Sequence, residues 1–154
     1  PRIVDGDTIH IKSNKIRLHG IDAPETKQTC KINNEDWYCG KQSTKELKNL
    51  INNRKVECIV NDIDRYKRYI AICSVNDIII NQWMVRNGWA IAYRYYSKDY
   101  IVDEEYAHDN KLIFQSDTDE RMNDVLESID YLIENPTYFR IISIFSSTNK
   151  SSTN

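Results

Sequence analysis

Apolar and polar residues alternate in about five short segments, which is the pattern of strands that are buried on one face. The corner Asp5-Gly6-Asp7 joins the first two segments, and Ser13-Asn14 forms the turn before the third. We expect the fourth and fifth segments to pair around a sharp turn at Asp64 to Lys67. The predicted strands are Ile3 to Val4, Thr8 to Ile11, Lys15 to His19, Lys55 to Asp64 and Arg68 to Val75, followed by a short segment at Ile78 to Ile80.

Helical signals occur in three places. Lys41 to Asn52 has its apolar residues at helical spacing on a polar background, which predicts an amphipathic helix. Asn81 is a residue type that caps helices, and Gly88 is placed to end the short helix that follows it. A third helix is predicted from about Lys98 to Asn110. One helix between the third and fourth strands, with further helices at the end, predicts an α+β, mainly β fold: a five-stranded OB-fold barrel with about three helices.

Two regions lie outside this barrel pattern. Ala23 to Gly40 is polar and is predicted as a long, mobile loop, and long loops in compact domains are usually functional. From Asp117 the chain is predicted to form an amphipathic helix that ends at Pro136, then an apolar segment from Tyr138 to Phe145 and a disordered end. We therefore expect a barrel domain over residues 1–116 and a C-terminal helical extension over residues 117–154.

Composition limits the size of the fold and the kind of partner. The chain has 154 residues, 40% of them hydrophobic, which suits one domain with a core and an appendage. Residues 1–116 hold 18 Lys and Arg against 16 Asp and Glu, whereas residues 117–154 hold 3 against 7. A protein that coats nucleic acid would be much more basic, so weak and transient contact is favoured. A monomer is expected, with self-association or covering of the cleft by the extension as the alternative.

The four cysteines fall into two local pairs, Cys30 with Cys39 and Cys58 with Cys73. Cys58 and Cys73 lie in two apolar segments that antiparallel strands would bring together. This arrangement favours disulfides and an oxidising compartment over the alternatives of reduced thiols or zinc ligands. No apolar run has the length of a membrane span. We expect a secreted or periplasmic protein whose signal segment is absent from this chain, since numbering begins at Pro1.

A set of acidic residues has the chemistry of a hard-cation site. Asp7 and Asp22 are oxygen ligands, and the backbone carbonyl of Ala23 is expected to complete the set. Few protein ligands and several waters suit Ca²⁺, with Mg²⁺ as the second choice. A bound divalent ion lowers the pKa of water and binds a phosphate oxygen. The corner Asp5-Gly6-Asp7 by itself is more often only a turn.

The neighbouring residues have the chemistry of phosphodiester cleavage. Glu25 follows Asp22 across a proline turn, where it is placed to act as general base on a water. Arg17 and Arg68 carry planar cations that grip phosphate. Each of these residues alone has an ordinary explanation as a strand charge or a polar turn, whereas the joint pattern is far more specific. Tyr66 and Tyr96 are candidates to stack a base beside the phosphate, with a place in the core or on the barrel surface as the alternative.

Four motifs resemble those of the staphylococcal nuclease (thermonuclease) family. They are the DGDT corner at Asp5 to Thr8, the IRLxGIDAPE segment at Ile16 to Glu25, the DxYGR turn at Asp64 to Arg68 and the LVxxGWA helix end at Met84 to Ala90. The resemblance covers roughly Arg2 to Asn110. It implies an OB-type barrel and calcium-dependent cleavage of DNA and RNA with little sequence preference, leaving 3′-phosphate ends.

By matched position, the resemblance also implies roles for single residues. Asp7 and Asp22 match metal ligands, together with the Ala23 carbonyl. Asp5 resembles a carboxylate that supports the metal site without binding the metal itself. The catalytic residues implied are Arg17, Glu25 and Arg68.

The sequence departs from the family pattern at one turn residue. Lys67 stands where the family has glycine, and if that position is left-handed the substitution costs about 1 kcal/mol and re-aims Arg68. The added cation would compensate by attracting phosphate. The rival interpretation of the whole chain is a barrel that binds nucleic acid or protein without cutting it. Scaffolds of this kind typically lose the acidic and arginine positions that are kept here, which favours the enzyme.

Overall fold

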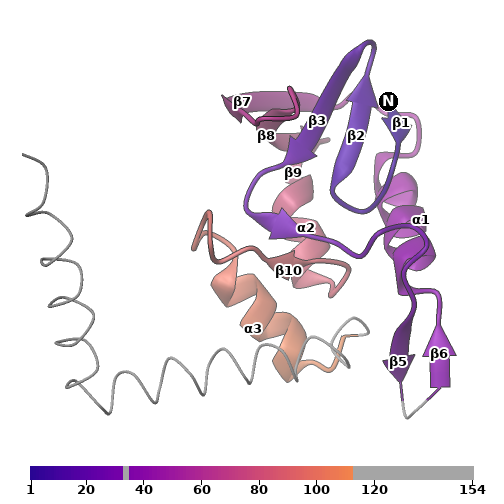
Figure 1. Cartoon of the computed structure of the whole chain (residues 1–154). Helices are drawn as coiled ribbons and strands as arrows, with labels where there is room; N and C mark the ends of the chain where they lie inside the picture. The colour runs from indigo at the N-terminus through magenta and orange to yellow at the C-terminus, as the bar shows by residue number, and fades with distance from the viewer. Residues whose placement is uncertain (33–34, 113–154) are drawn as a thin grey trace, which may run out of the picture. The chain divides into compact units, whose positions relative to one another are not determined.

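The computed structural model of the chain describes residues 1–32 and 35–112. Within these residues it contains ten strands and three helices (Figure 1). The strands are β1 (Arg2–Ile3), β2 (Thr8–Ile11), β3 (Asn14–Leu18), β4 (Ile21–Asp22), β5 (Cys30–Ile32), β6 (Glu35–Trp37), β7 (Glu57–Ile63), β8 (Tyr69–Val75), β9 (Ile78–Ile79) and β10 (Ile91–Ala92). The helices are α1 (Cys39–Ile51), α2 (Ile80–Arg86) and α3 (Ile101–Asp109). The expected helical extension and apolar segment of residues 117–154 lie outside the described residues.

The main sheet has the strand order β1-β2-β3-β8-β7, with β9 paired to β8. Its central pair, β3 and β8, is parallel, with Arg17 opposite Ile70, and the other pairs are antiparallel. The parallel pair exists because the chain leaves the sheet after β3 and returns through α1 before β7 begins. Two small sheets, β10-β4 and β5-β6, complete the strand pairing in the described residues. The fold is therefore α+β with three helices and mixed sheets.

The predicted five-stranded barrel is present only as an open sheet. Among the described residues, β1 and β7 are the two ends of the five-strand path and do not pair with each other. The physical reason is the length of β1, whose two residues both pair with β2. Strand β7 consequently keeps large apolar side chains in solvent, with Ile59 74% exposed.

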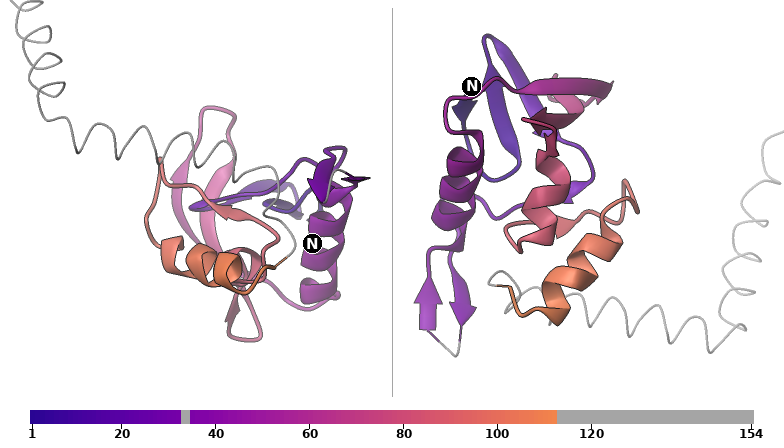
Figure 2. Two further views of the ribbon diagram at one scale, coloured as in Figure 1. Left: turned by 90° about the horizontal axis from the view of Figure 1, so that it is seen from below. Right: turned by 180° about the vertical axis from the view of Figure 1, so that it is seen from behind.

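The main hydrophobic core lies between the sheet and the helices, and a smaller cluster forms around Cys30 and Cys39. Strand β8 contributes alternate residues, as expected for a strand buried on one face, and α1 contributes the residues at its predicted apolar spacing. Figure 1 shows α1 beside the end of the sheet formed by β1 and β2, and the rear view of Figure 2 shows α2 and α3 close together. The largest fully buried apolar side chains are Ile9, Leu18, Ile21, Leu47, Ile51, Val75, Ile80, Met84 and Val85.

The predicted long loop of residues 23–40 contains a small hairpin. Strands β5 and β6 pair antiparallel, with Cys30 opposite Trp37, and the hairpin extends from the beginning of α1 (Figure 1). The polar composition of the segment predicts a loop, and strands of three residues are too short to show an alternating apolar pattern in the sequence. A disulfide between Cys30 and Cys39 closes the segment.

The second disulfide joins Cys58 and Cys73, which are register partners in β7 and β8. Both pairings agree with the prediction from the sequence, and the described residues contain no free cysteine. None of the helices in the described part combines the length and the apolar character needed to cross a membrane.

The helix boundaries differ from the predictions by a few residues. Helix α1 begins at Cys39 instead of Lys41, and α3 begins at Ile101 instead of Lys98. The end of α2 is as predicted, because Gly88 adopts a φ of 73° and its N–H donates to the Val85 carbonyl at 2.9 Å.

The prediction that Asn81 caps α2 is wrong. Asn81 is fully buried, and its amide bonds to backbone groups of the sheet. Its Oδ1 accepts from the Cys73 N–H at 3.0 Å, and its Nδ2 donates to the carbonyls of His19 and Ala71 at 2.9 and 3.2 Å. The side chain therefore satisfies backbone groups at the end of β3 and in β8, and it ties α2 to both.

We expect Asn81→Ala to lower the free energy of unfolding by about 2 to 4 kcal/mol, because it leaves buried backbone groups without partners. Asn49→Ala is the matched control, since Asn49 is exposed on α1 and, within the described part of the chain, its side chain hydrogen-bonds to Glu46 alone. It should change stability by less than about 0.5 kcal/mol. Urea denaturation measures both values. Equal effects of the two substitutions would contradict the bridging role of Asn81.

Candidate active site

The corner between β1 and β2 buries Asp7 and holds its backbone from both sides. The Asp5 carboxylate accepts the Asp7 N–H at 3.0 Å, and the Val4 N–H donates to the Thr8 carbonyl at 3.0 Å. The Asp7 carbonyl accepts the Leu18 N–H at 2.8 Å, which ties the corner to β3. Asp7 is 1% exposed as a result. Asp5 thus supports Asp7 through the backbone.

Gly6 is required at this corner for reasons of space. A Cβ atom at this position would lie 2.1 Å from the Ser43 Oγ of α1 and 2.7 Å from the Ala23 Cβ. The absence of a side chain therefore lets the corner, α1 and the chain after β4 approach one another closely.

Arg17 joins the two aspartates that were predicted as metal ligands. The antiparallel register of β2 and β3 sets Arg17 opposite Thr8, next to Asp7. One guanidinium nitrogen, Nη1, donates to Asp7 Oδ1, and the other, Nη2, donates to Asp22 Oδ1 at 2.7 Å. Asp22 is held in place by β4, where it pairs with Ile91 of β10. The structure therefore brings Asp7, Arg17 and Asp22 into one ionic cluster.

Asp7 accepts further hydrogen bonds beyond the one from Arg17. The Thr8 hydroxyl donates to Oδ1 at 2.9 Å, and the Ala23 N–H donates to Oδ2 at 2.9 Å. Burial nevertheless raises the pKa of Asp7 to about 7, against the lowering effect of the Arg17 charge. The side chain of Asp22 is 48% exposed and faces solvent on its other side.

The donor set fits a hard divalent cation with few protein ligands. Two carboxylates already bind one positive group between them, and carboxylate oxygens are the ligands that Ca²⁺ and Mg²⁺ take. In the described residues no group of three or more His, Cys, Asp or Glu side chains is arranged to hold a metal, so water would have to supply the remaining ligands. At Ala23 the observed contact to Asp7 is made by the N–H, and its carbonyl stays a predicted ligand.

Glu25 lies in the turn after β4, close in sequence to the cluster. Its side chain is exposed and makes no hydrogen bond or ion pair with the residues that the structure describes. The turn itself is ordered by its backbone, since the Gln28 N–H donates to the Glu25 carbonyl at 2.7 Å. A role for the Glu25 carboxylate stays a prediction.

Arg68 belongs to a separate turn between β7 and β8. The Asp64 carboxylate organises this turn, because it accepts the N–H groups of Tyr66 and Arg68, each at 2.9 Å, and the Arg68 Nε at 2.7 Å. Among the described residues Arg68 forms no hydrogen bond or ion pair with the cluster of Asp7, Arg17 and Asp22. The side-chain direction of Arg68 is therefore set by Asp64.

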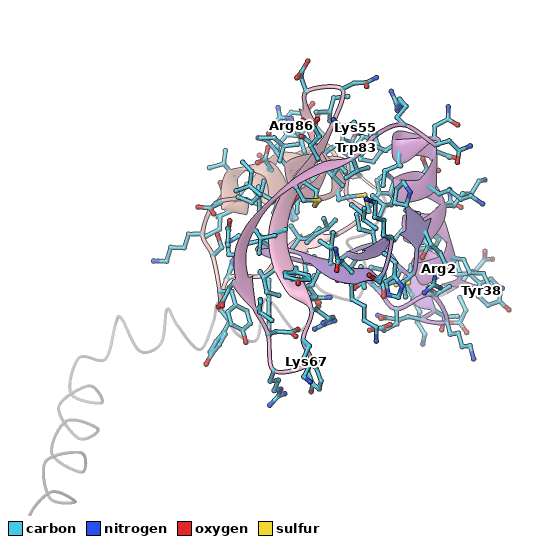
Figure 3. All side chains as sticks on the ribbon, turned by 90° about the horizontal axis from the view of Figure 1, so that it is seen from above. Arg2, Tyr38, Lys55, Lys67, Trp83 and Arg86 are labelled. Carbon is cyan, nitrogen blue, oxygen red and sulfur yellow. A yellow bond between two sulfur atoms is a disulfide. The ribbon has the colours of Figure 1, made fainter. Side chains whose placement is uncertain are left out.

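Lys67 adopts the left-handed conformation that a glycine would take without cost. Its φ is 61°, and Figure 3 shows it at the tip of the turn between β7 and β8, pointing away from the sheet. Tyr66, beside it, is 63% exposed, with the guanidinium of Arg68 5.5 Å from its ring centroid. The guanidinium of Arg65 lies closer to the same ring, at 4.9 Å. The turn thus carries three cations and an aromatic ring, with Arg65 and Lys67 exposed to solvent.

Tyr96 is part of an exposed group of three tyrosine rings after β10. Its ring centroid lies 5.1 Å from that of Tyr93 and 5.0 Å from that of Tyr95. Tyr96 is 68% exposed and Tyr95 82%. Tyr66 and Tyr96 therefore both lie outside the core, so of the alternatives to base stacking only a place on the barrel surface fits them.

Sequence reasoning missed three residues that support the site. Thr8 binds Asp7, Asp64 orients Arg68, and Gly6 allows the close approach of α1. Thr8 and Asp64 stand inside the motifs that were singled out, so the motifs themselves carried a signal. Gly6 stands in the same Asp5-Gly6-Asp7-Thr8 motif, but the contacts that exclude a side chain there come from Ser43 and Ala23, so the local sequence does not show the reason for the glycine.

Fold and site together define the class of protein: a small α+β domain whose sheet presents two aspartates and an arginine as one ionic site. Comparison with known families then identifies it further. Residues 15–114 match the family described as staphylococcal nuclease homologue, and this match covers more than half of the chain. The chain belongs to that family. The matched range includes Arg17, Asp22, Glu25 and Arg68 and begins after Asp7.

Several named relatives are similar to this chain over 92 to 110 residues. The succinoglycan biosynthesis protein ExoI of Rhizobium meliloti is 34% identical over 92 residues, which cover 58% of this chain and 48% of that protein. An uncharacterized endonuclease of Escherichia coli O157:H7 is 36% identical over 106 residues, or 66% of this chain and 63% of the relative. The micrococcal nuclease of Shigella flexneri is 33% identical over 110 residues, or 63% and 58%. The aligned region spans about half to just under two thirds of the length of these relatives.

The raised pKa of Asp7 predicts how stability depends on pH in the presence of a chelator. Between about pH 4 and 7 the folded protein holds the Asp7 proton more tightly than the unfolded chain does. The contribution of Asp7 to stability is therefore complete below about pH 4 and is lost as the pH rises toward 7. Thermal unfolding from pH 4 to 8 should show the wild-type protein losing stability relative to Asp7→Asn, which cannot titrate. Parallel curves for the two proteins would show that Asp7 ionises as in the unfolded chain.

Proposed function

We propose that the chain is a nuclease that hydrolyses phosphodiester bonds of DNA, RNA or both with little sequence preference and leaves 3′-phosphate ends. The observation that supports this most strongly is the binding of Asp7 and Asp22 by the two nitrogens of Arg17. It combines ligands for a hard cation with a phosphate-binding fork at one place. The nuclease names of the relatives agree with this function.

Asp7 and Asp22, with the Ala23 carbonyl, would hold a divalent cation, Ca²⁺ in preference to Mg²⁺. When bound, such an ion neutralises charge on the phosphate and lowers the pKa of water. The partly exposed Asp22 gives access from solvent, and the buried Asp7 supplies a fixed ligand oxygen. A second positive charge would also favour the ionised form of Asp7, whose burial disfavours it.

The chain's own residues would divide the hydrolysis between them. Glu25 takes a proton from the attacking water or orders that water, and its exposed side chain is free to do so. The water oxygen forms the new bond to phosphorus, while the bond from phosphorus to the 5′ oxygen breaks and that oxygen takes up a proton. Arg17 and Arg68 bind the phosphate oxygens as negative charge builds up in the transition state.

For both arginines, a phosphate would compete with carboxylates for the guanidinium group. Each guanidinium group now bonds to a carboxylate, Arg17 to Asp7 and Asp22, and Arg68 to Asp64. A phosphate group offers the same planar fork the same kind of oxygen acceptor. The carboxylates of Asp7, Asp22 and Asp64 keep the two guanidinium groups oriented when no substrate is bound.

Affinity for the nucleic acid would come from stacking and backbone charge instead of base-specific hydrogen bonds. Tyr66 and Tyr96 are exposed and offer ring faces to unpaired bases of single-stranded or frayed substrate. Lys67 points into solvent from the turn that carries Arg68 and would attract the backbone phosphates (Figure 3). None of these contacts distinguishes one base from another.

The two disulfides support an oxidising compartment, which we propose to be periplasmic or extracellular. We also propose that the protein acts as a monomer on nucleic acid. Self-association through residues 117–154 and the domain boundary at residue 116 both depend on residues beyond the described range, and they stay predictions.

Substitution of the three proposed catalytic residues tests this function. Arg17→Ala, Arg68→Ala and Glu25→Ala should each lower kcat on single-stranded DNA or RNA by about 100-fold or more while the protein stays folded. Arg2→Ala is the control, because Arg2 is exposed and bonds to His10 at the edge of the sheet. The readout is product formation in Ca²⁺, in Mg²⁺ and in a chelator, with cleavage expected in Ca²⁺ and absent in the chelator.

Two results would contradict the proposal. Cleavage at the wild-type rate by all three variants would show that the site lies elsewhere. Tight binding of nucleic acid without cleavage in either ion would favour the rival interpretation of a binding module.

A further inference from the structure

The turn that carries Glu25 packs directly against the first turn of α1. Within it, the Gln28 N–H donates to the Glu25 carbonyl at 2.7 Å, and the Glu25 N–H donates to the Gln28 Oε1 at 3.2 Å. The Gln28 carbonyl in turn accepts the Gly40 N–H at 3.3 Å. Helix α1 has no side-chain cap, so this loop carbonyl satisfies one of its free N–H groups.

Gly40 lets the loop and the helix come this close. A Cβ atom at Gly40 would lie 1.7 Å from the carbonyl oxygen of Glu25 and 2.6 Å from its carbonyl carbon. These are backbone atoms, so a larger residue has to push the loop or the helix away. The position of the Glu25 backbone therefore depends on the absence of a side chain at Gly40.

The disulfide between Cys30 and Cys39 fixes the same contact covalently. Cys39 is fully buried and directly precedes Gly40, and Cys30 follows two residues after Gln28. The Sγ atom of Cys39 lies 3.6 Å from the Gln28 carbonyl oxygen. The bond thus joins the end of the Glu25 turn to the beginning of α1.

A hydrogen bond on the other side ties the turn to the corner that carries Asp7. The Thr26 hydroxyl donates to the Val4 carbonyl at 2.9 Å, and Val4 directly precedes Asp5-Gly6-Asp7. The backbone around Glu25 is thereby held against both α1 and the metal-ligand corner. Its carboxylate, in contrast, has no partner of its own in the described residues.

We propose that Gly40 and the Cys30–Cys39 disulfide are positioning residues for Glu25. An exposed carboxylate without side-chain partners can be aimed only through its backbone, and these two features fix that backbone. The inference rests on the proposed function, in which Glu25 acts on the attacking water. It assigns to the disulfide an effect on turnover in addition to stability.

The two disulfides of the chain provide a matched comparison. Cys30→Ala/Cys39→Ala should lower kcat at least tenfold with less than a twofold change in KM. Cys58→Ala/Cys73→Ala removes the bond between β7 and β8 and should lower the unfolding temperature. Its kcat should stay within twofold of wild type, because the turn that carries Arg68 is held by the Asp64 carboxylate and not by this bond. Equal kcat values for the two double variants would overturn the proposal.

Gly40→Ala tests the same role with both disulfides intact. It replaces the disulfide variant as the test if that variant does not fold. It should lower kcat at least tenfold although alanine favours the helix. Amide hydrogen exchange gives a readout that does not depend on activity: the Gln28 N–H should exchange at least tenfold faster in Gly40→Ala than in wild type. Unchanged exchange and unchanged kcat would overturn the proposal.

Combination with Glu25→Ala separates this inference from the proposed function. In the Glu25→Ala background, neither Gly40→Ala nor loss of the Cys30–Cys39 bond should lower kcat further. If Glu25→Ala alone keeps the wild-type kcat, the proposed function of Glu25 is wrong. If Glu25→Ala loses activity and the positioning variants do not, only the present inference is wrong.

Discussion

The site depends on the pairing of Arg17 with two aspartates. A carboxylate that is 1% exposed, as Asp7 is, would be costly to ionise without a charged partner. Arg17 supplies that partner and reaches Asp22 with its second nitrogen, so one side chain links the two carboxylates. The cluster sets one guanidinium against two carboxylates, and burial still raises the pKa of Asp7. In this setting, binding of a divalent ion or loss of Arg17 as a partner would strongly change the ionisation of Asp7.

The rest of the domain brings the parts of this cluster together. Strand register sets Arg17 beside Asp7, pairing of β4 with β10 holds Asp22, and Gly6 allows α1 to pack against the corner. Arg68 and its turn are organised separately by Asp64. The proposed site therefore has a preformed part around Arg17 and two outer parts, Glu25 and Arg68, that would meet on the substrate.

Much of this arrangement follows from the sequence. Alternation of apolar residues predicted the strands of the main sheet, helical spacing predicted α1, and the motifs singled out the residues that now form the cluster. The predictions failed where distant contacts decide the outcome. Asn81 bonds to the carbonyl of His19, 62 residues earlier, and nothing in its local sequence distinguishes this from a cap. The hairpin of β5 and β6 is held by a disulfide instead of by an apolar pattern, and the open sheet follows from the short β1.

A double-mutant cycle between Asp7 and Arg17 tests the central interaction most directly. The free energy of unfolding would be measured at pH 8 in a chelator for wild type, Asp7→Asn, Arg17→Met and the double variant. The account predicts a coupling energy of about 1 to 3 kcal/mol, because each residue loses its main electrostatic partner when the other is replaced. Additive effects, within about 0.3 kcal/mol, would show that the two side chains do not interact and would contradict the account.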